Sequence, residues 1–440
     1  MKKYFVVLFM LFITISFAQA PDTVWTKTYG EYEFSDCGNA VIQTSDGGYF
    51  VTGWWYSGNI VLLKTDTLGD TLWVRNGGPG AGYAVDQTFD GGYFIGGATQ
   101  HGDFYVFRVD SLGNMIGNCQ APGSPCNSLE ETSDSGCIAV GTGNGPQSQD
   151  VLLIKTLWDG SGIWTSYLGD LWEDDFGGAI QQTADGGFII AGMTYGFGAT
   201  NSDVLLIKTD ASGDSLWNKI YGSLSSDAGY SVDQTTDGGY VITGYNGWGG
   251  RDVYLIKTDS AGNLMWEQTY GGSEDDEGCS VQQTADGGYI VVGYTRSFGP
   301  GTPLNRNIYI IRTDPNGDTL WTQTYGTTSD DCGSAIQVTS DGGYIVTGQL
   351  SVDYGGGHYS PDIVLMRMAN DAAAVREINA VELGTYCGAT IFHGPLLIPE
   401  HKNYKVFDIA GRVVLPQHIK PGIYFIEIDG KITRKVIKVR

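Results

Sequence analysis

The feature that most constrains this chain is a short motif, Asp-Gly-Gly followed by an aromatic residue, which returns along most of its length. Six intact copies and one degraded copy begin at Asp46, Asp90, Asp134, Asp185, Asp237, Asp286 and Asp341. Successive copies lie 44 to 55 residues apart. A period of this size is typical of arrays in which each repeat forms one supersecondary unit. The sequence therefore predicts seven units of one kind.

One repeat contains four short runs of strand-forming residues. In the sixth unit, residues 280–284 and 289–294 flank the Asp-Gly-Gly turn, and residues 308–313 and 319–325 flank a Pro-Asn-Gly turn. Four antiparallel strands in about fifty residues are the content of one β-propeller blade. The predicted fold is all-β: a seven-bladed β-propeller of four-stranded antiparallel blades, followed by a small C-terminal β-sandwich.

The two ends of the repeat region are out of phase with the repeat. Residues 24–30 match the fourth strand of a unit but precede the first Asp-Gly-Gly turn. The seventh unit stops at its third strand, residues 362–368. We expect the N-terminal strand to complete the last blade, because this closes the ring and leaves no free sheet edge.

A second repeated turn has the pattern Asp-x-x-Gly-x-x-x-Trp. It occurs at residues 66–73, 210–217, 259–266 and 314–321. The pattern resembles the tryptophan-docking repeat of quinoprotein propellers, with one residue fewer between Asp and Gly. The resemblance implies packing of each blade through an indole, and it carries no quinone site to this chain. A Trp on every blade is more typical of a core than of a cofactor platform.

The N-terminus is typical of a secretory signal. Lys2 and Lys3 precede an apolar run over residues 4–17, and the small residues Ala18 and Ala20 follow. No later stretch approaches the roughly 20 apolar residues of a membrane span. We expect removal of residues 1–18 and an exported monomer, secreted or on the outer cell surface, with no membrane span after signal removal.

The last seventy residues lack the repeat. Residues 407–412, 422–424 and 434–440 supply an aromatic-Asp-x-x-Gly-Arg turn, a Gly-Ile-Tyr strand and a basic terminal strand. These resemble the marks of the C-terminal sorting domain of type IX secretion cargo, although residues 394–399 replace its Tyr-Pro-Asn-Pro segment. The resemblance implies a small antiparallel β-sandwich that the secretion machinery recognises. An ordinary accessory sandwich is the alternative.

The predicted domain boundaries follow from these segments. They are a signal peptide over residues 1–18, a propeller over 21–369, a linker over 370–380 and a type IX secretion-like sorting domain over 381–440.

The chain is acidic, with a formal net charge of −24. Residues 21–370 carry 13 Lys and Arg against 42 Asp and Glu, whereas residues 371–440 carry 10 against 7. A body this acidic repels phosphate backbones, so we expect no nucleic-acid partner.

Acidic loops precede the predicted first strands, which should line the channel of the propeller. In five units an Asp stands at the same point, two residues before a Gly: Asp36, Asp175, Asp227, Asp276 and Asp331. A ring of carboxylates at the channel mouth could bind a hard cation such as Ca²⁺. The alternative is an Asx-type turn in which each Asp bonds the backbone. Both interpretations stay open at this point.

The loops between second and third strands open on the same face and are rich in aromatic residues. They contain Trp54, Trp55, Tyr56, Tyr195, Tyr245, Trp248, Tyr294, Phe298, Tyr354 and Tyr359. Exposed rings on variable loops are typical of a sugar-binding or protein-binding face. The alternative is that these rings fold back and cover blade edges.

Signatures of catalysis are poor, and we assign no catalytic residue. Gly-x-Ser-x-Gly and His-Glu-x-x-His are both missing from the sequence. Carboxylates such as Asp175 and Asp227 could be paired for glycoside hydrolysis, but nothing selects one pair. The expected function is non-catalytic binding of a glycan or protein ligand. A carbohydrate-active enzyme and a surface adhesion or scaffold component are the alternatives.

The seven cysteines are an odd number, so at least one is unpaired within a monomer. Cys119 and Cys126 are close enough in sequence to close a short loop. A disulfide between them and two free thiols are both compatible with the sequence.

Overall fold

The computed structural model describes residues 20–30, 34–55, 58–355, 358–371, 389–392, 404–408, 413–414, 422–428 and 431–438. The chain divides into two compact units, residues 1–375 and 376–440. The predicted signal peptide, most of the predicted linker and residues 394–399 lie outside the described residues.

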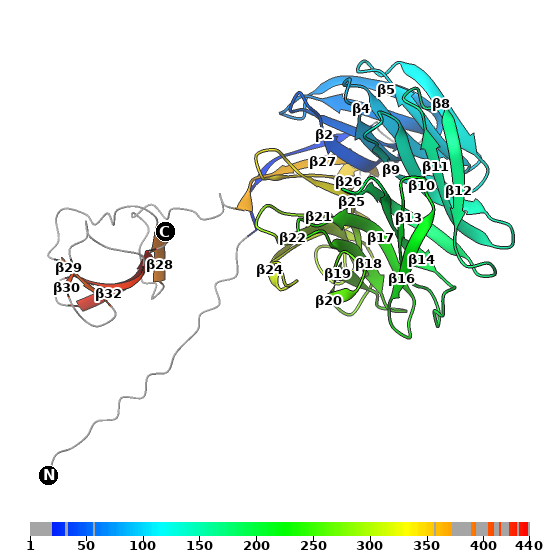
Figure 1. Cartoon of the computed structure of the whole chain (residues 1–440). Helices are drawn as coiled ribbons and strands as arrows, with labels where there is room; N and C mark the ends of the chain where they lie inside the picture. Colours follow the sequence, from blue (N-terminus) through cyan, green and yellow to red (C-terminus); the bar gives the residue numbers. More distant parts are fainter. Residues whose placement is uncertain are drawn as a thin grey trace, which may run out of the picture. The chain divides into compact units, whose positions relative to one another are not determined.

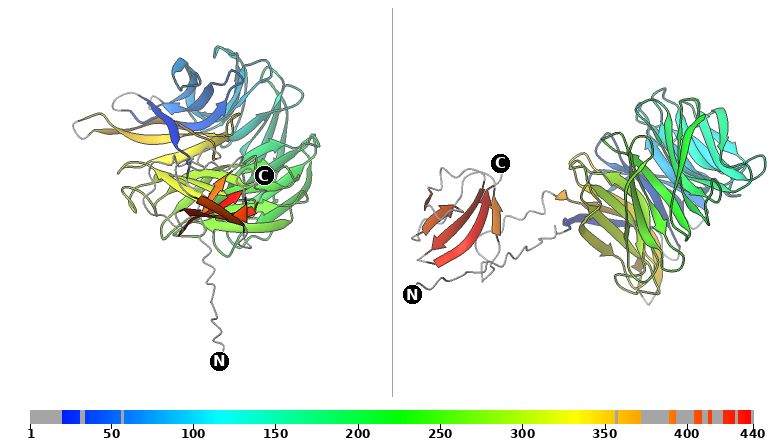
Figure 2. Two further views of the ribbon diagram at one scale, coloured as in Figure 1. Left: turned by 90° about the vertical axis from the view of Figure 1, so that its left-hand side faces the viewer. Right: turned by 60° about the horizontal axis from the view of Figure 1, so that its bottom comes forward.

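The first unit is a ring of antiparallel sheets around a central channel, which confirms the predicted propeller (Figure 1, Figure 2). Blades 1 and 2 are built from β2 (Cys37–Gln43), β3 (Tyr49–Trp55), β4 (Asn59–Thr65), β5 (Thr71–Gln87), β6 (Tyr93–Thr99), β7 (Phe104–Val109) and β8 (Met115–Ala121). Blade 3 is β9 (Cys126–Glu131), β10 (Cys137–Asn144), β11 (Gln149–Thr156) and β12 (Gly162–Leu168). Blade 4 is β13 (Asp175–Gln182), β14 (Phe188–Thr194), β15 (Asp203–Thr209) and β16 (Ser215–Tyr221).

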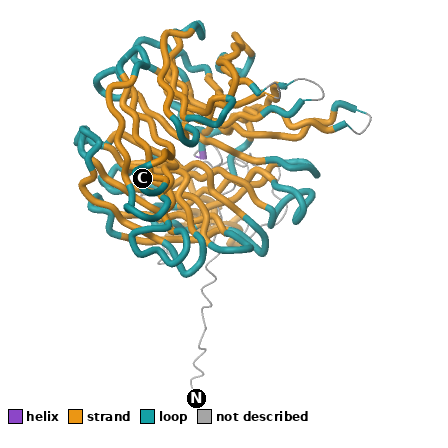
Figure 3. Tube along the Cα trace, turned by 90° about the vertical axis from the view of Figure 1, so that its right-hand side faces the viewer, coloured by secondary structure: helices purple, strands orange, loops and turns teal. Residues whose placement is uncertain are grey.

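The remaining blades follow in the same order. Blade 5 is β17 (Asp227–Gln234), β18 (Tyr240–Asn246), β19 (Asp252–Thr258) and β20 (Leu264–Tyr270). Blade 6 is β21 (Asp276–Gln283), β22 (Tyr289–Thr295), β23 (Asn307–Thr313) and β24 (Thr319–Tyr325). Blade 7 is β25 (Cys332–Val338), β26 (Tyr344–Asp353), β27 (Tyr359–Met368) and β1 (Thr23–Tyr29). Figure 3 shows how strands dominate this unit.

The N-terminal strand closes the ring as predicted. β1 pairs antiparallel with β27, from Thr23 opposite Met368 to Tyr29 opposite Ile363. The last blade therefore contains strands from both ends of the repeat region.

Blades 1 and 2 differ from the others because one strand serves both. The first part of β5 pairs with β4, and from Gly80 onward β5 pairs with β6. The acidic loop that separates most other blades is replaced here by Gly77-Gly78-Pro79-Gly80. This short link continues as extended chain, so the two blades form one seven-stranded sheet.

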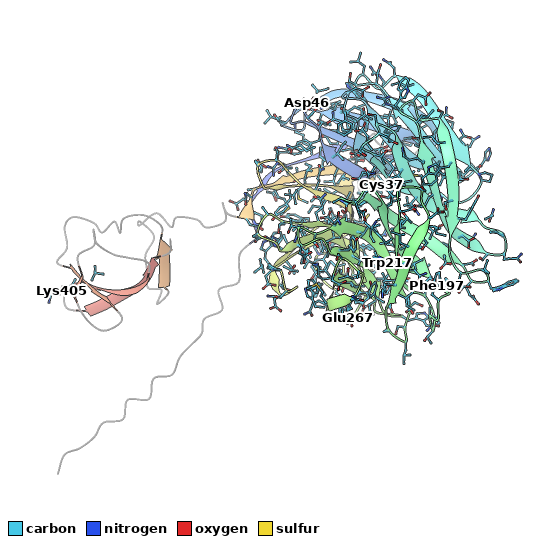
Figure 4. All side chains as sticks on the ribbon, viewed as in Figure 1. Cys37, Asp46, Phe197, Trp217, Glu267 and Lys405 are labelled. Carbon is cyan, nitrogen blue, oxygen red and sulfur yellow. The ribbon has the colours of Figure 1, made fainter. Side chains whose placement is uncertain are left out.

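The Trp of five fourth strands packs on a glycine of the next blade, and in three of these strands a Tyr bonds the same glycine. A Cβ placed on Gly262 would lie 2.8 Å from the indole of Trp217, which Figure 4 labels, and the Tyr221 hydroxyl donates a 2.6 Å hydrogen bond to the Gly262 carbonyl. Equivalent indole contacts join Trp25 to Gly69, Trp73 to Gly113, Trp164 to Gly213 and Trp266 to Gly317. These contacts place the indoles between blades, as the tryptophan-docking resemblance implied.

The Asp of each Asp-Gly-Gly turn is the centre of a polar cluster. Asp237 accepts hydrogen bonds from the Thr235 hydroxyl and the Gly239 N–H, and it pairs with the buried ammonium of Lys257 at 3.0 Å. The equivalent ion pairs are Lys64–Asp46, Arg108–Asp90, Lys155–Asp134, Lys208–Asp185, Arg312–Asp286 and Arg367–Asp341. The motif therefore fastens the turn to the third strand of its own blade.

The second unit contains one five-stranded sheet in its described residues. Its strands, in the order β28-β32-β31-β29-β30, are Ala389–Phe392, Lys431–Lys438, Gly422–Ile428, Tyr404–Asp408 and Val413–Val414. β28 pairs parallel with β32, whereas the other pairs are antiparallel. The sheet is thus mixed rather than antiparallel throughout, and a second sandwich layer stays a prediction.

Within the part of the chain that the structure describes, no helix is long and apolar enough to cross a membrane.

Candidate ligand-binding site at the channel mouth

The channel wall is held together by a ring of hydrogen bonds between first strands. A side-chain oxygen of one blade accepts a main-chain N–H of the next, as where Gln282 accepts from Val338 at 2.7 Å and Asp233 accepts from Gln283 at 2.9 Å. The other members are Gln181 with Gln234, Glu130 with Gln182, Asp86 with Glu131 and Gln337 with Gln43. In blade 1 this position is Ile42, which has no side-chain oxygen, so the main-chain N–H of Gln87 in blade 2 donates to Asp86 of its own blade instead.

A second ring of hydrogen bonds uses the next residue of each first strand, whose side-chain oxygen accepts a main-chain N–H of the preceding blade. Gln87 accepts the main-chain N–H of Ser45 at 2.7 Å, and Gln283 accepts that of Thr236 at 2.8 Å. The same contact joins Glu131 to Phe89, Gln182 to Ser133, Gln234 to Ala184 and Gln43 to Ser340. Val338 occupies this position in blade 7. The two residues that end the first strands therefore join blade to blade, except through Ile42 and Val338.

Three acids of the first ring are half-buried in the channel wall. Burial raises the pKa of Asp86 to about 6 and that of Glu130 to about 7, and it also raises the pKa of Asp233. A cavity of about 240 Å³ lies among these side chains. The wall is therefore polar and stays partly protonated near neutral pH.

The five predicted metal-site aspartates lie at five different blade interfaces, all of them buried. Asp227 accepts the Ser223 N–H at 2.6 Å and the Gly247 N–H at 3.2 Å. Asp175, Asp276 and Asp331 also accept main-chain N–H groups. These contacts match the turn interpretation, because each carboxylate bonds the loop beside its own strand.

The structure does not bring these five side chains together in one ring-shaped site. Among the described residues, no group of three or more His, Cys, Asp or Glu side chains is placed to hold a metal ion. Asp175 and Asp227, offered as a pair for glycoside hydrolysis, begin the first strands of blades 4 and 5 and bond separate loops.

The predicted aromatic residues divide into exposed and covered groups. Exposed rings are Tyr195, Trp248, Phe298, Tyr354 and Tyr359; Trp54, Trp55 and Tyr294 are half-buried, and Tyr245 is buried. Trp248 is the most open, with 77% of its surface exposed. Tyr56 lies outside the described residues. Both sequence interpretations therefore apply, each to different residues.

A cluster of arginine and aromatic side chains gathers where β17, β18, β19 and β21 reach the channel mouth. The Arg251 guanidinium lies 4.2 Å from the ring centroid of Tyr245 and bonds the buried carboxylate of Glu277 at 2.6 Å. The rings of Tyr230 and Tyr245 are 5.7 Å apart. Stacking of this kind is favourable because the ring face attracts the cation.

The cluster continues into blades 6 and 7. The Arg306 guanidinium lies 5.3 Å from the ring centroid of Tyr294. Burial raises the pKa of Tyr294, and the nearby carboxylate of Glu277 raises it further. Arg306 also helps to lower the pKa of Cys332, which takes a hydrogen bond from Cys37 of blade 1. We call Tyr230, Tyr245, Arg251, Glu277, Tyr294 and Arg306 the channel-mouth cluster.

The sequence indicated only part of this cluster. Tyr245 and Tyr294 were expected from their loops, whereas Tyr230, Arg251, Glu277 and Arg306 were not. A possible signal was the scarcity of Arg in an acidic propeller, since two of its few arginines lie beside aromatic loops.

A separate groove lies between the closing blade and blade 1. Its cavity volume is about 630 Å³, and its wall includes Tyr29, Phe34, Trp55 and Ile363. This volume is within the range of small-ligand pockets, and apolar residues make up most of the wall. Among the described residues of the predicted ligand face, Trp55 lines this groove.

The six described cysteines are free thiols. Cys119 and Cys126 are therefore unbonded in this structure, and Cys126 is packed in a hydrophobic cluster of blades 2 and 3.

Comparison with known proteins shows the fold and no more. No protein-family model matches the chain, and no curated protein matches it. Among solved structures, the WD40 β-propeller domain of Doa1 aligns with a TM-score of 0.52 and 13% identity, covering 81% of this chain and 99% of that one. The Dos1 propeller aligns with a TM-score of 0.47 and 10% identity, covering 76% and 78%. The Doa1 likeness supports a β-propeller, a fold used widely for binding.

Proposed function

We propose that this protein is an exported or cell-surface binding module that recognises a glycan or protein ligand at its channel mouth, without catalysis. The observation that carries the proposal is the channel-mouth cluster, in which Arg251 stacks on Tyr245 and bonds Glu277. Aromatic faces beside fixed charged hydrogen-bonding groups suit a glycan, since sugar rings offer both apolar faces and hydroxyls.

The other parts of the proposal rest on the sequence. The signal-like N-terminus favours export, and the basic terminal strand with the Gly-Ile-Tyr segment favours recognition by type IX secretion machinery. A glycoside hydrolase gains no support from the carboxylate positions, because Asp175 and Asp227 bond separate loops. A scaffold role remains the alternative if the channel mouth binds nothing.

The test is a glycan array probed with the full chain, followed by a release assay for reducing sugar on every binding glycan. We expect binding without release, and a loss of at least about tenfold in affinity for Tyr230→Ala and for Arg251→Gln. Phe89→Ala is the matched control, because this exposed ring lies beside an Asp-Gly-Gly turn on the opposite face. Binding that survives both channel variants would refute the site. A clean array together with capture of a specific protein would identify a protein ligand.

A further inference from the structure

The face that carries the acidic loops has another repeated feature, which is a pair of side-chain oxygens between consecutive blades. One member is the Asp that begins or precedes a first strand, and the other lies in the first half of the third strand of the preceding blade. The pairs are Asp150 with Asp175, Asp203 with Asp227, Asp252 with Asp276, Asn307 with Asp331 and Asp362 with Asp36. Five of the seven blade interfaces therefore carry the same arrangement, which we call the interblade oxygen pair.

Each interblade oxygen pair lies beside the glycine that follows a fourth strand. A Cβ placed on Gly222 would lie 2.4 Å from Asp203 Oδ1 and 2.6 Å from Asp227 Oδ2. The same double approach occurs at Gly30, Gly169, Gly271 and Gly326. The two oxygens thus converge on one point from different blades. Any larger residue at the glycine would collide with both of them.

In four of the five pairs, the oxygen on the third strand is buried without a hydrogen-bond donor among the described residues. Asp203 is 6% exposed, yet its Oδ1 accepts no hydrogen bond, whereas its partner Asp227 accepts two main-chain N–H groups. In three other pairs the oxygen that faces the glycine is likewise unpartnered: Asp252 Oδ1, Asn307 Oδ1 and Asp362 Oδ1. A buried acceptor left this way is costly, so a donor or a cation is needed to compensate.

The pair between blades 6 and 7 has an amide in place of one carboxylate. The Asn307 amide donates to the carbonyls of Phe298 and Pro300 at 3.2 and 3.0 Å, which turns Oδ1 toward Asp331. Asp331 already accepts the Ser351 N–H at 2.6 Å and the Thr327 hydroxyl at 3.0 Å. The Asn307 amide oxygen, which carries no proton, therefore faces the Asp331 carboxyl group. A cation satisfies both an amide oxygen and a carboxylate, and it satisfies the four Asp–Asp pairs equally.

We propose that the interblade oxygen pairs are five cation sites, each binding one hard divalent cation of the Ca²⁺ type between two neighbouring blades. Two side-chain oxygens come from the pair, and main-chain carbonyls and water complete the shell. Such a cation balances the negative charge of the pair and holds the two neighbouring blades together. With only two side-chain ligands, we expect a dissociation constant of about 10⁻⁴–10⁻³ M.

The experiment compares the EDTA-treated full chain with and without about 5 mM CaCl₂, a concentration above the expected dissociation constant. We expect the melting temperature to rise by about 3 °C or more, and equilibrium dialysis with radioactive calcium to approach five ions per chain. The triple variant Asp203→Ala, Asp252→Ala, Asp362→Ala should bind about two ions and lose more than half of the rise.

The matched control is Asp103→Ala. Asp103 precedes the third strand of blade 2 at the equivalent position, but the next blade has Ser124 where the others have Asp. This variant should keep the full calcium response. An unchanged melting temperature in calcium, or a triple variant that keeps the full response, would overturn the proposal. If the triple variant does not fold, fewer than one ion bound per native chain at this concentration overturns it equally.

Discussion

Asp86 in blade 2 accepts a hydrogen bond of 2.8 Å from the main-chain N–H of Glu131 in blade 3. This contact holds a carboxylate in the channel wall, where burial raises its pKa to about 6, and burial raises the pKa of Glu130 to about 7. In the unfolded chain these groups titrate at about 3.9 and 4.3. The folded chain therefore binds more protons than the unfolded chain between about pH 4 and pH 7.

Stability should consequently increase as the pH falls from 7 to 5 in EDTA. We expect a gain on the order of 1–3 kcal/mol in the free energy of unfolding, measured by urea titration. The variant Asp86→Asn, Glu130→Gln keeps both acceptor oxygens and should show a flatter profile. Asp103→Asn, which leaves the channel wall intact, should keep the native slope. An equally steep profile in the channel variant would contradict the assignment.

The contact between Trp217 and Gly262 predicts different costs for two glycines with similar backbones. Gly262 and Gly238 have φ of 72° and 81°, but a Cβ meets the indole only at Gly262, and nothing lies within 4 Å at Gly238. Both Ala variants should lose about 1 kcal/mol through the left-handed conformation. Gly262→Ala should lose about 1–3 kcal/mol more through overpacking. Thermal unfolding that ranks the two variants equally would show that the indole moves aside freely.

The ion pair of Asp237 with Lys257 predicts a strong effect from a half-exposed carboxylate. Asp237→Asn leaves a buried ammonium without its charge partner, and we expect a loss of about 1–3 kcal/mol. The double variant Asp237→Asn, Lys257→Met should recover part of this loss, because it removes the buried charge. A double-mutant cycle in chemical denaturation measures the coupling. Additive losses would mean that the two side chains act independently.

The pairing of β1 with β27 predicts that removal of residues 21–30 is far more costly than its length suggests. The deletion exposes the edge of β27 and removes the packing of Trp25 on Gly69. We expect a loss of at least about 3 kcal/mol and a tendency to aggregate. A chain that begins at residue 21 is the control. Coincident melting curves of the two chains would rule out closure by this strand.

The thiol of Cys332 should be the most reactive of the described cysteines. A hydrogen bond from Cys37 and the charge of Arg306 outweigh burial and lower the pKa of Cys332, whereas burial raises the pKa of Cys126. Iodoacetamide near neutral pH should alkylate Cys332 at least about tenfold faster than Cys126, as followed by peptide mass spectrometry. Arg306→Gln should slow the reaction of Cys332 alone. Equal rates in the two proteins would remove Arg306 as a cause.

Much of the fold follows from the sequence because the repeat is periodic. The Asp-Gly-Gly turn, the paired strand runs and the displaced strand at residues 24–30 predicted blade content, blade number and closure, and the structure confirms them. The continuous β5 was not predicted, because four consecutive residues decide whether the chain bends or stays extended there. The partner of the repeated Asp was also missed, since Lys257 lies on another strand, 20 residues away.

The candidate site was only partly predictable, because its contacts cross from blade to blade. Tyr245 was identified from its loop, but its stacking partner Arg251 and the acid Glu277 are brought together only by the ring. Likewise, the repeated position of Asp227 was visible in the sequence, whereas its pairing with Asp203 requires the geometry at Gly222. Local patterns show which residues recur, and assembly decides which of them meet.

The two hydrogen-bond rings of the channel have a mechanical consequence. Each ring has one gap, at Ile42 between blades 1 and 2 and at Val338 between blades 6 and 7, while the closing junction carries both contacts through Gln43. Blades 7 and 1 are therefore joined by both kinds of inter-blade hydrogen bond, whereas the boundary of blade 1 with blade 2 and that of blade 7 with blade 6 each lack one of the two. Because the continuous β5 also joins blade 1 to blade 2, the propeller under tension should tear between blades 6 and 7 before it tears at the junction where the two ends of the repeat region meet.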